Sequence, residues 1–280
     1  MNNNLFWQKL WYNLVLPMII IAFINFLISF LKTWIVDYLS WKGMIKFTLR
    51  FIYSLCLGFH KYALGGMWFI YTLVLIKIVY QYVPKRFLIL VFVLCLAGTL
   101  AYCHYMSSSW RYKYANAIAD VMISMPFFLI GNYLQHLKEW LNKEHDNKLL
   151  ICAMAVSFVI IVMCARINQH VRLYACDYDQ SLLLCLIGGV CGTFGIWAIG
   201  KLLGSMPQWC FKLANGTIVI LGFSGYFIQP LRDLFNLPPR FDFVTSGIIL
   251  LLFLPIIIFC ERYFPYILGI MRVNAVQQKN

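Results

Sequence analysis

The chain has 280 residues, of which 62% are hydrophobic and only 12% are charged, and its formal net charge is +13. Soluble domains carry about a quarter charged residues, so the composition excludes an ordinary soluble protein. The basic residues are spread over many short loops, as in proteins that meet anionic lipid surfaces, and they form no single basic face with interleaved aromatic residues, so we expect no nucleic-acid partner.

Apolar runs long enough to cross about 30 Å of hydrocarbon recur along the chain. They predict an all-α, polytopic helical membrane protein with about eight transmembrane helices, in a single membrane domain covering residues 1–280. The expected spans are Leu10–Leu31, Tyr62–Val83, Phe87–Met106, Tyr114–Leu134, Leu149–Ala165, Ser181–Leu203, Phe211–Ile228 and Phe241–Cys260. No cleavable signal peptide is expected, because the first run is long enough to remain as an anchor.

The segment between the first two spans, residues 32–61, is too long for a simple turn. Lys42, Lys46 and Arg50 recur at intervals of four residues and therefore share one face of a helix. A second face is apolar and carries Phe47, Phe51 and Leu55. This pattern predicts an interfacial amphipathic helix. Two roles are open for it: anchoring at a lipid surface, or a basic face that meets an anionic or phosphorylated donor.

The second span opens with the most distinctive local pattern of the chain. Gly65 and Gly66 are followed directly by Met and then by Trp68 and Phe69. Glycine lets a neighbouring backbone or a ligand approach closely, because it has no side chain. Trp68 and Tyr71 are amphipathic rings suited to the headgroup level. We therefore expect a helix to enter the bilayer here, and we take Trp68 as a candidate substrate-binding residue.

Two ionisable residues lie inside expected spans, where charge is costly and a functional role is the default hypothesis. Lys77 is six residues from the end of its span, so it either snorkels to the interface or lies on a substrate pathway. Asp120, in an Ala-Ile-Ala-Asp-Val segment, requires a cationic partner or a water-filled cavity. Structural pairing and substrate contact both remain open for it.

Three residues near span ends are candidates for chemistry. His104 lies beside Tyr102 and Tyr105, and His60 lies just before the glycine pair. Either residue is a candidate general base, since imidazole as a side-chain type suits proton transfer near neutral pH, or is a hydrogen-bonded interfacial residue. Arg111 is a candidate clamp for a phosphate or carboxylate, or a residue of the headgroup region.

The ten cysteines include no C-x-x-C pair. Most of them lie within apolar runs, among them Cys95, Cys152, Cys185 and Cys260. A free cysteine packs as a small hydrophobic residue. We therefore expect no disulfide framework and no metal site.

Four segments, taken in order, resemble a known family. Residues 6–17 run from Phe-Trp-Gln-Lys to Leu-Val-Leu-Pro, residues 67–73 read Met-Trp-Phe-Ile-Tyr-Thr-Leu, residues 125–131 read Met-Pro-Phe-Phe-Leu-Ile-Gly, and residues 215–221 read Asn-Gly-Thr-Ile-Val-Ile-Leu. Their order and rough spacing resemble the integral-membrane acyltransferase 3 family over nearly the whole chain. That family acylates sugars and other hydroxyl acceptors in bacterial envelopes.

The resemblance implies a multi-pass protein of the bacterial inner membrane that acts as an O-acyltransferase. It would transfer an acyl group, most simply acetyl, to a hydroxyl of an envelope polysaccharide or glycolipid. The donor substrate would be acyl-CoA, most simply acetyl-CoA, and no cofactor would be bound. The implied partners are membrane lipids and the carbohydrate or glycolipid acceptor, with a homo-oligomer left open. A positioned histidine base would contribute about 10²–10⁴-fold to the rate.

The chain also departs from the family pattern. The family opens with a helix that bears an acid, a basic-Gly pair and then the histidine to which catalysis is ascribed, and no residue before Lys9 matches it. Asn13, Gly66 and Ser224 stand where the family often has arginine, histidine and histidine. We therefore expect that the N-terminal catalytic-His helix is lacking and that activity is impaired.

Given these departures, His104 and His60 are the candidate replacement bases. Two other classes of function are open. A transporter of an envelope glycan or lipid would be favoured by an intramembrane pair of Lys77 and Asp120 together with the glycine-rich sixth span. A non-catalytic membrane partner would be favoured by the lacking helix.

Overall fold

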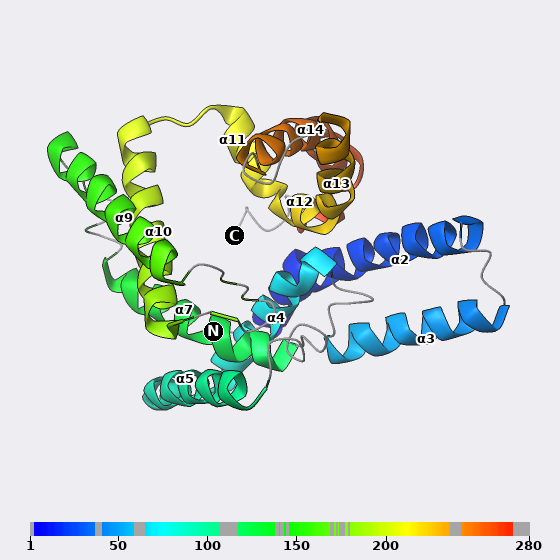
Figure 1. The fold of residues 1–280 in the computed structure, drawn as a ribbon, viewed down its shortest axis with the longest axis horizontal. Helices are drawn as coiled ribbons and strands as arrows, with labels where there is room; N and C mark the ends of the chain where they lie inside the picture. The colour runs from blue at the N-terminus through cyan, green and yellow to red at the C-terminus, as the bar shows by residue number, and fades with distance from the viewer. Residues whose placement is uncertain are drawn as a thin grey trace, which may run out of the picture. The chain divides into compact units, whose positions relative to one another are not determined.

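A computed structural model describes residues 3–36, 41–58, 65–106, 117–137, 140, 143, 146–168, 171, 173, 177, 178, 180–235 and 242–270 (Figure 1). The α-helices are α1 (Asn3–Leu10), α2 (Leu16–Val36), α3 (Trp41–Leu57), α4 (Trp68–Tyr82), α5 (Leu88–Tyr105), α7 (Ala117–Leu134), α9 (Asn147–Asn168), α10 (Leu182–Leu203), α11 (Gln208–Asn215), α12 (Thr217–Phe223), α13 (Gly225–Phe235) and α14 (Asp242–Tyr263). Short helical turns are η1 (Trp11–Val15, a π-helix), η3 (Gly65–Met67), η4 (Lys85–Phe87), η5 (Gln135–Leu137) and η8 (Pro265–Leu268).

The predicted all-α, polytopic class is confirmed. In the described part of the chain, six helical segments are long and apolar enough to cross a membrane: Asn3–Ile35, Lys85–Tyr105, Ala117–Leu134, Asn147–Asn168, Leu182–Leu203 and Val244–Tyr263. Each overlaps a span expected from hydropathy. The second expected span is represented by the shorter apolar helix α4, which ends just before the extended Pro84 (φ −58°, ψ 140°). A residue before proline is disfavoured in the helical region, so the helix ends there.

The seventh expected span, Phe211–Ile228, differs from the prediction because it is divided among α11, α12 and α13. The first break is at Gly216, where a β-carbon would lie 2.2 Å from Cδ1 of Ile257 in α14. Close packing therefore requires glycine at a position where glycine weakens a helix. The Thr217 hydroxyl donates to the Ala214 carbonyl at 2.8 Å and so satisfies an acceptor at the end of α11.

At the second break, at Ser224, a side chain from another helix hydrogen-bonds to the backbone. The Asn25 amide Nδ2 of α2 donates to the Gly222 carbonyl at 3.1 Å, and the Tyr226 hydroxyl donates to the Asn25 carbonyl at 3.4 Å. A backbone carbonyl released inside a membrane protein must find an internal partner. Asn25 supplies that partner, which lets an apolar segment interrupt its helix.

The chain divides into two compact units. The first consists of Met1–Val74 and Pro207–Asn280, and the second of Leu75–Met206. The boundary falls inside α4, so this helix begins in the first unit and ends in the second. Each unit has its own apolar core, and the two are described separately.

The core of the first unit joins α2, η3, α4, α12, α14 and η8. Its buried residues are Met18, Ile21, Met67, Ile70, Ile218, Val219, Ile249, Phe253, Ile257, Cys260 and Leu268. At Gly66 a β-carbon would lie 2.3 Å from the Leu221 carbonyl oxygen of α12. The glycine pair that opens the second span therefore lets the backbone of α12 approach closely. A neighbouring backbone was one of the two alternatives from the sequence, the other being a ligand.

A second close approach in this unit is between Gly269 and the backbone carbonyl of Asn13, which Pro17 leaves without its usual helical donor. Pro17 has no N–H to donate to the carbonyl of Asn13, four residues earlier in the chain. Asn13 lies in the π-helical turn η1, which interrupts the α-helical pattern between α1 and α2. Gly269 packs at that carbonyl with φ +68°, and a β-carbon there would lie 2.5 Å from the Asn13 oxygen. Glycine is thus required for both space and backbone conformation.

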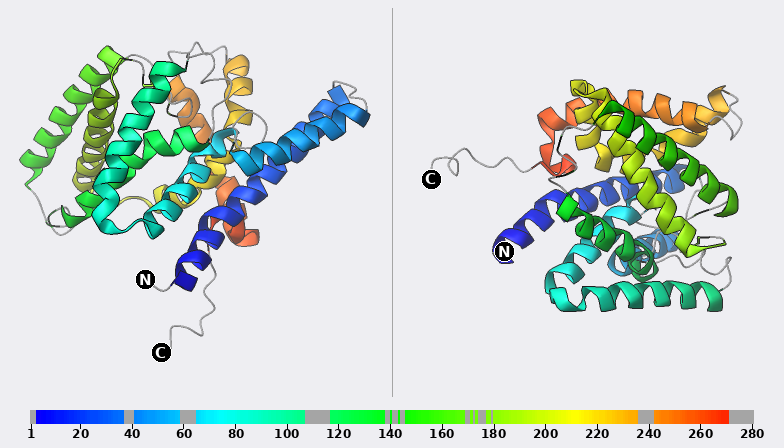
Figure 2. Two further views of the ribbon diagram at one scale, coloured as in Figure 1. Left: turned by 90° about the horizontal axis from the view of Figure 1, so that it is seen from below. Right: turned by 90° about the vertical axis from the view of Figure 1, so that its left-hand side faces the viewer.

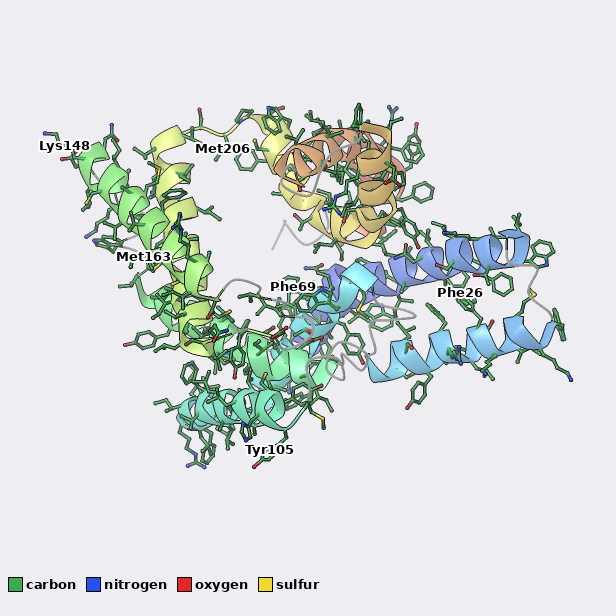
Figure 3. All side chains as sticks on the ribbon, in the orientation of Figure 1. Phe26, Phe69, Tyr105, Lys148, Met163 and Met206 are labelled. Atoms are coloured by element: carbon green, nitrogen blue, oxygen red, sulfur yellow. The ribbon has the colours of Figure 1, made fainter. Side chains whose placement is uncertain are left out.

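Helices α2 and α3 lie side by side in the first unit (Figures 1 and 2). Phe26 of α2 lies between them (Figure 3), with ring centroids 4.4 Å from Phe51 and 5.8 Å from Phe47. Phe30, one turn later in α2, is 6.4 Å from Phe47, so the two helices run antiparallel. The predicted apolar face of the 32–61 segment therefore packs against α2.

In the second unit, glycines of α10 face α9. A β-carbon at Gly195 would lie 3.2 Å from Cβ of Ser157, and one at Gly188 would lie 3.4 Å from Cβ of Cys164. Small residues let two membrane helices pack closely, and Figure 2 shows α9 and α10 side by side. The glycine-rich composition of the sixth span is thus explained by helix packing.

Candidate functional site

A polar cleft lies at the C-terminal end of α5. It has a volume of about 600 Å³ and is lined by Leu100, Ala101, Cys103, His104 and Tyr105 of α5 together with Tyr178 and Gln180, which precede α10. All of these residues belong to the second unit. One of the two candidate bases therefore lines a cavity large enough for a small ligand.

The cleft wall is held by an apolar cluster behind it. Tyr102 and Cys103 of α5 and Tyr178 pack against buried residues of α7 and α10, namely Ala119, Ile123, Leu182 and Leu186. The helix α5 ends where the Met106 N–H donates to the Tyr102 carbonyl and the chain becomes extended. This termination places the adjacent side chains of His104 and Tyr105 at the end of a helix that is long and apolar enough to cross a membrane.

His104 and Tyr105 form the accessible rim of the cleft. Both residues are exposed, Tyr105 to 81%, and their rings meet edge to face with centroids 5.1 Å apart. Figure 3 marks Tyr105 at this end of α5. An accessible imidazole can exchange protons with a bound hydroxyl, and phenol and amide groups supply hydrogen bonds. The groups present fit proton transfer on a polar, hydroxyl-bearing ligand.

Two other candidates lie in the second unit but do not line this cleft. Asp120 is completely buried in the first turn of α7, where the helix N-terminus favours a negative charge. Lys77 is half-buried on α4, next to Ile76, which packs with Met125 and Leu129. Within the described residues the structure shows no ion pair between Lys77 and Asp120, so the pairing that would favour a transporter is not observed.

The remaining candidates lie elsewhere. Trp68 begins α4 in the first unit, is half-buried, and meets Phe69 edge to face with ring centroids 6.0 Å apart. His60 and Arg111 lie outside the described residues. Of the four candidates that the structure describes, His104 alone lines the cleft.

Among the cleft residues with polar or thiol side chains, three were not named from the sequence: Cys103, Tyr178 and Gln180. Cys103 was interpreted as one more apolar cysteine, although its position beside His104 was a usable signal. Tyr178 and Gln180 are more than 70 residues from His104 in the chain, and no spacing rule connects them. Only the packing of α5 near α10 places them together.

Comparisons with known proteins give a limited likeness. A UPF0324 membrane protein of Campylobacter jejuni is 31% identical over 101 residues, which is 35% of this chain and 26% of that protein. The chain therefore matches about a quarter of the relative's length. The repeated apolar helices and this relative agree on one point. The chain is a multi-pass membrane protein. No family model and no solved structure matches it.

Proposed function

We propose that this chain is a membrane O-acyltransferase of the acyltransferase 3 type, located in the bacterial inner membrane. It transfers an acyl group from acyl-CoA, most simply acetyl-CoA, to a hydroxyl of an envelope polysaccharide or glycolipid. The observation that carries the proposal is the accessible His104 in a polar cleft at the end of a membrane helix. The segments that resemble the family, around Trp68 and Pro126, support it.

The proposed reaction uses His104 as the general base. Its neutral imidazole accepts the proton of the acceptor hydroxyl while that oxygen attacks the thioester carbonyl. The tetrahedral adduct collapses as the carbon–sulfur bond breaks, and the imidazolium returns the proton to the departing thiolate. Gln180 and Tyr178 supply hydrogen-bond donors for the developing oxyanion or the acceptor hydroxyls.

The test is transfer of labelled acetyl from acetyl-CoA to envelope polysaccharide in membranes that contain the chain. We expect His104→Gln, which keeps polarity and cannot take up a proton at neutral pH, to lower the rate by about 10²–10⁴-fold. Cys103→Ser, an isosteric change in the same cleft, is the matched control and should keep most of the rate. His60→Ala tests the other candidate base.

Two outcomes would contradict the proposal. Transfer no greater than that of membranes without the chain would reject an active enzyme and favour a non-catalytic membrane partner. Full activity in His104→Gln with loss in His60→Ala would move the base to residue 60. Equal protein levels in all membranes must be verified by immunoblot.

A transporter of an envelope glycan or lipid is the second candidate, and one observation favours it. The interrupted segment α11–α12–α13 resembles the discontinuous helices that form substrate sites in many transporters. Reconstituted vesicles that move a labelled lipid-linked sugar between leaflets without acyl-CoA would support this candidate. Movement equal to that of empty vesicles would reject it.

A further inference from the structure

The hairpin of α2 and α3 carries exposed basic and aromatic side chains where α2 ends and α3 begins. We call this group the hairpin end and define it as Lys32, Trp34, Trp41, Lys42 and Lys46, all exposed. Trp34 is 54% exposed and Trp41 is 74% exposed. Two tryptophans that face outward beside three lysines form an unusual surface for an apolar chain, and it has no role in the cleft of His104.

Helix α3 presents three different faces around its axis. Phe47 and Phe51 pack against Phe26 of α2. A second face carries the cations Lys42, Lys46 and Arg50, all of which are exposed. A third face is apolar and also exposed, with Ile45, Leu49 and Ile52 at 47%, 61% and 51%. Exposed apolar and basic faces side by side suit the boundary between acyl chains and headgroups.

The charge around the hairpin end is strongly biased. Asp37, which lies outside the described residues, is the sole acidic residue in the sequence of residues 1–119. Within the described residues, the structure shows no carboxylate paired with Lys32, Lys42 or Lys46. The ammonium groups of these three lysines are therefore available to bind an anionic surface outside the chain.

We propose that the hairpin end binds the anionic phosphate headgroups of the bilayer surface. The three lysines contact lipid phosphates, and the indole rings of Trp34 and Trp41 lie at the headgroup level, where tryptophan is enriched. The exposed apolar face of α3 contacts acyl chains. This contact selects anionic over zwitterionic lipid, because each lysine near an anionic surface strengthens binding by roughly fivefold at most.

The experiment measures which lipid touches Trp41. The full chain is placed in nanodiscs of phosphatidylcholine with a fixed fraction of phosphatidylglycerol, and bromine is carried on the acyl chains of one lipid or the other. The fluorescence lost in Trp41→Phe isolates the signal of Trp41. At equal mole fraction, brominated phosphatidylglycerol should quench that signal roughly threefold more than brominated phosphatidylcholine.

Two paired variants test the role of charge. Lys42→Gln/Lys46→Gln should bring the quenching ratio to about one, and Lys42→Arg/Lys46→Arg should preserve it, since arginine keeps the charge. Raising the ionic strength should lower the ratio in the unmodified protein, a result that requires no variant to fold. A ratio near one without any substitution would overturn the proposal. So would loss of the preference on adding free CoA, which would assign the lysines to a soluble phosphorylated ligand.

Discussion

A single amide side chain joins two helices of the second unit. Asn168, the last residue of α9, is 2% exposed. Its Nδ2 donates to the Ser181 carbonyl at 2.8 Å, and its Oδ1 accepts from the Ser181 N–H at 2.9 Å. Ser181 is also the N-cap of α10, where its hydroxyl accepts from the Leu184 N–H. One residue therefore fixes both the end of α9 and the start of α10.

We expect Asn168→Ala to lower the free energy of unfolding by about 1–2 kcal/mol. The half-buried Ser181 N–H loses its acceptor, and the Ser181 carbonyl keeps only the Cys185 N–H as a donor. The measurement is thermal unfolding in detergent, followed by circular dichroism. Asn147→Ala is the matched control, since Asn147 is exposed at the opposite end of α9 and should change stability little. Equal melting temperatures for the two variants would show that the amide contact is not stabilising.

At the scale of elements, the contact between α2 and α3 depends on one ring. Phe26 has Phe23, Phe30, Phe47 and Phe51 within 6.4 Å between ring centroids. Two of these neighbours belong to α3. Since the remaining faces of α3 are exposed, Phe26 carries a large share of the packing that holds α3 beside α2.

Phe26→Ala should therefore release α3 from α2 at a cost of about 2 kcal/mol, below the range for a fully buried aromatic side chain because Phe26 is half-buried. Hydrogen exchange of the α3 amides should become faster, while exchange in α14 should remain unchanged. Phe23→Ala is the control, because Phe23 is 53% exposed and contacts Phe26 within the same helix. Unchanged α3 exchange in Phe26→Ala would place the stabilising contact elsewhere.

Hydropathy and periodicity located most elements, because a lipid-facing helix must be apolar along a length fixed by the bilayer. The helix expected around Lys46 and Phe51 is present as α3, since opposite helix faces differ in composition, and its interfacial placement stays a prediction. The breaks near Gly216 and Ser224 were not, because their cause is tertiary. Hydropathy cannot show that Ile257 occupies the space beside Gly216 or that the Asn25 amide donates to the released Gly222 carbonyl.

The candidate site was partly predictable for a similar reason. His104 was selected from its place at a span end, a local property of the sequence. Tyr178 and Gln180 are brought beside it by packing between distant segments, which a single sequence does not specify. Asp120 is completely buried, and its role, structural pairing or substrate contact, stays a prediction.

At the scale of the whole molecule, two separate cores are joined through α4 and at Met206–Pro207. In α4, Ile70 packs in the core of the first unit, whereas Ile76 packs with Met125 and Leu129 in the core of the second unit. Contiguous groups of buried contacts commonly open as cooperative units. The two units are therefore expected to differ in local stability and to respond separately to substitutions inside each core.

Gly66→Ala tests this expectation, because its β-carbon would lie 2.3 Å from a backbone oxygen of Leu221 that cannot move without α12. We expect a loss of about 1–3 kcal/mol and faster hydrogen exchange in α12, with α9 and α10 unchanged. Gly200→Ala is the control, since a β-carbon there would meet no atom within 4 Å outside its own helix backbone. Equal acceleration in α10 and α12 would mean that the two cores open together.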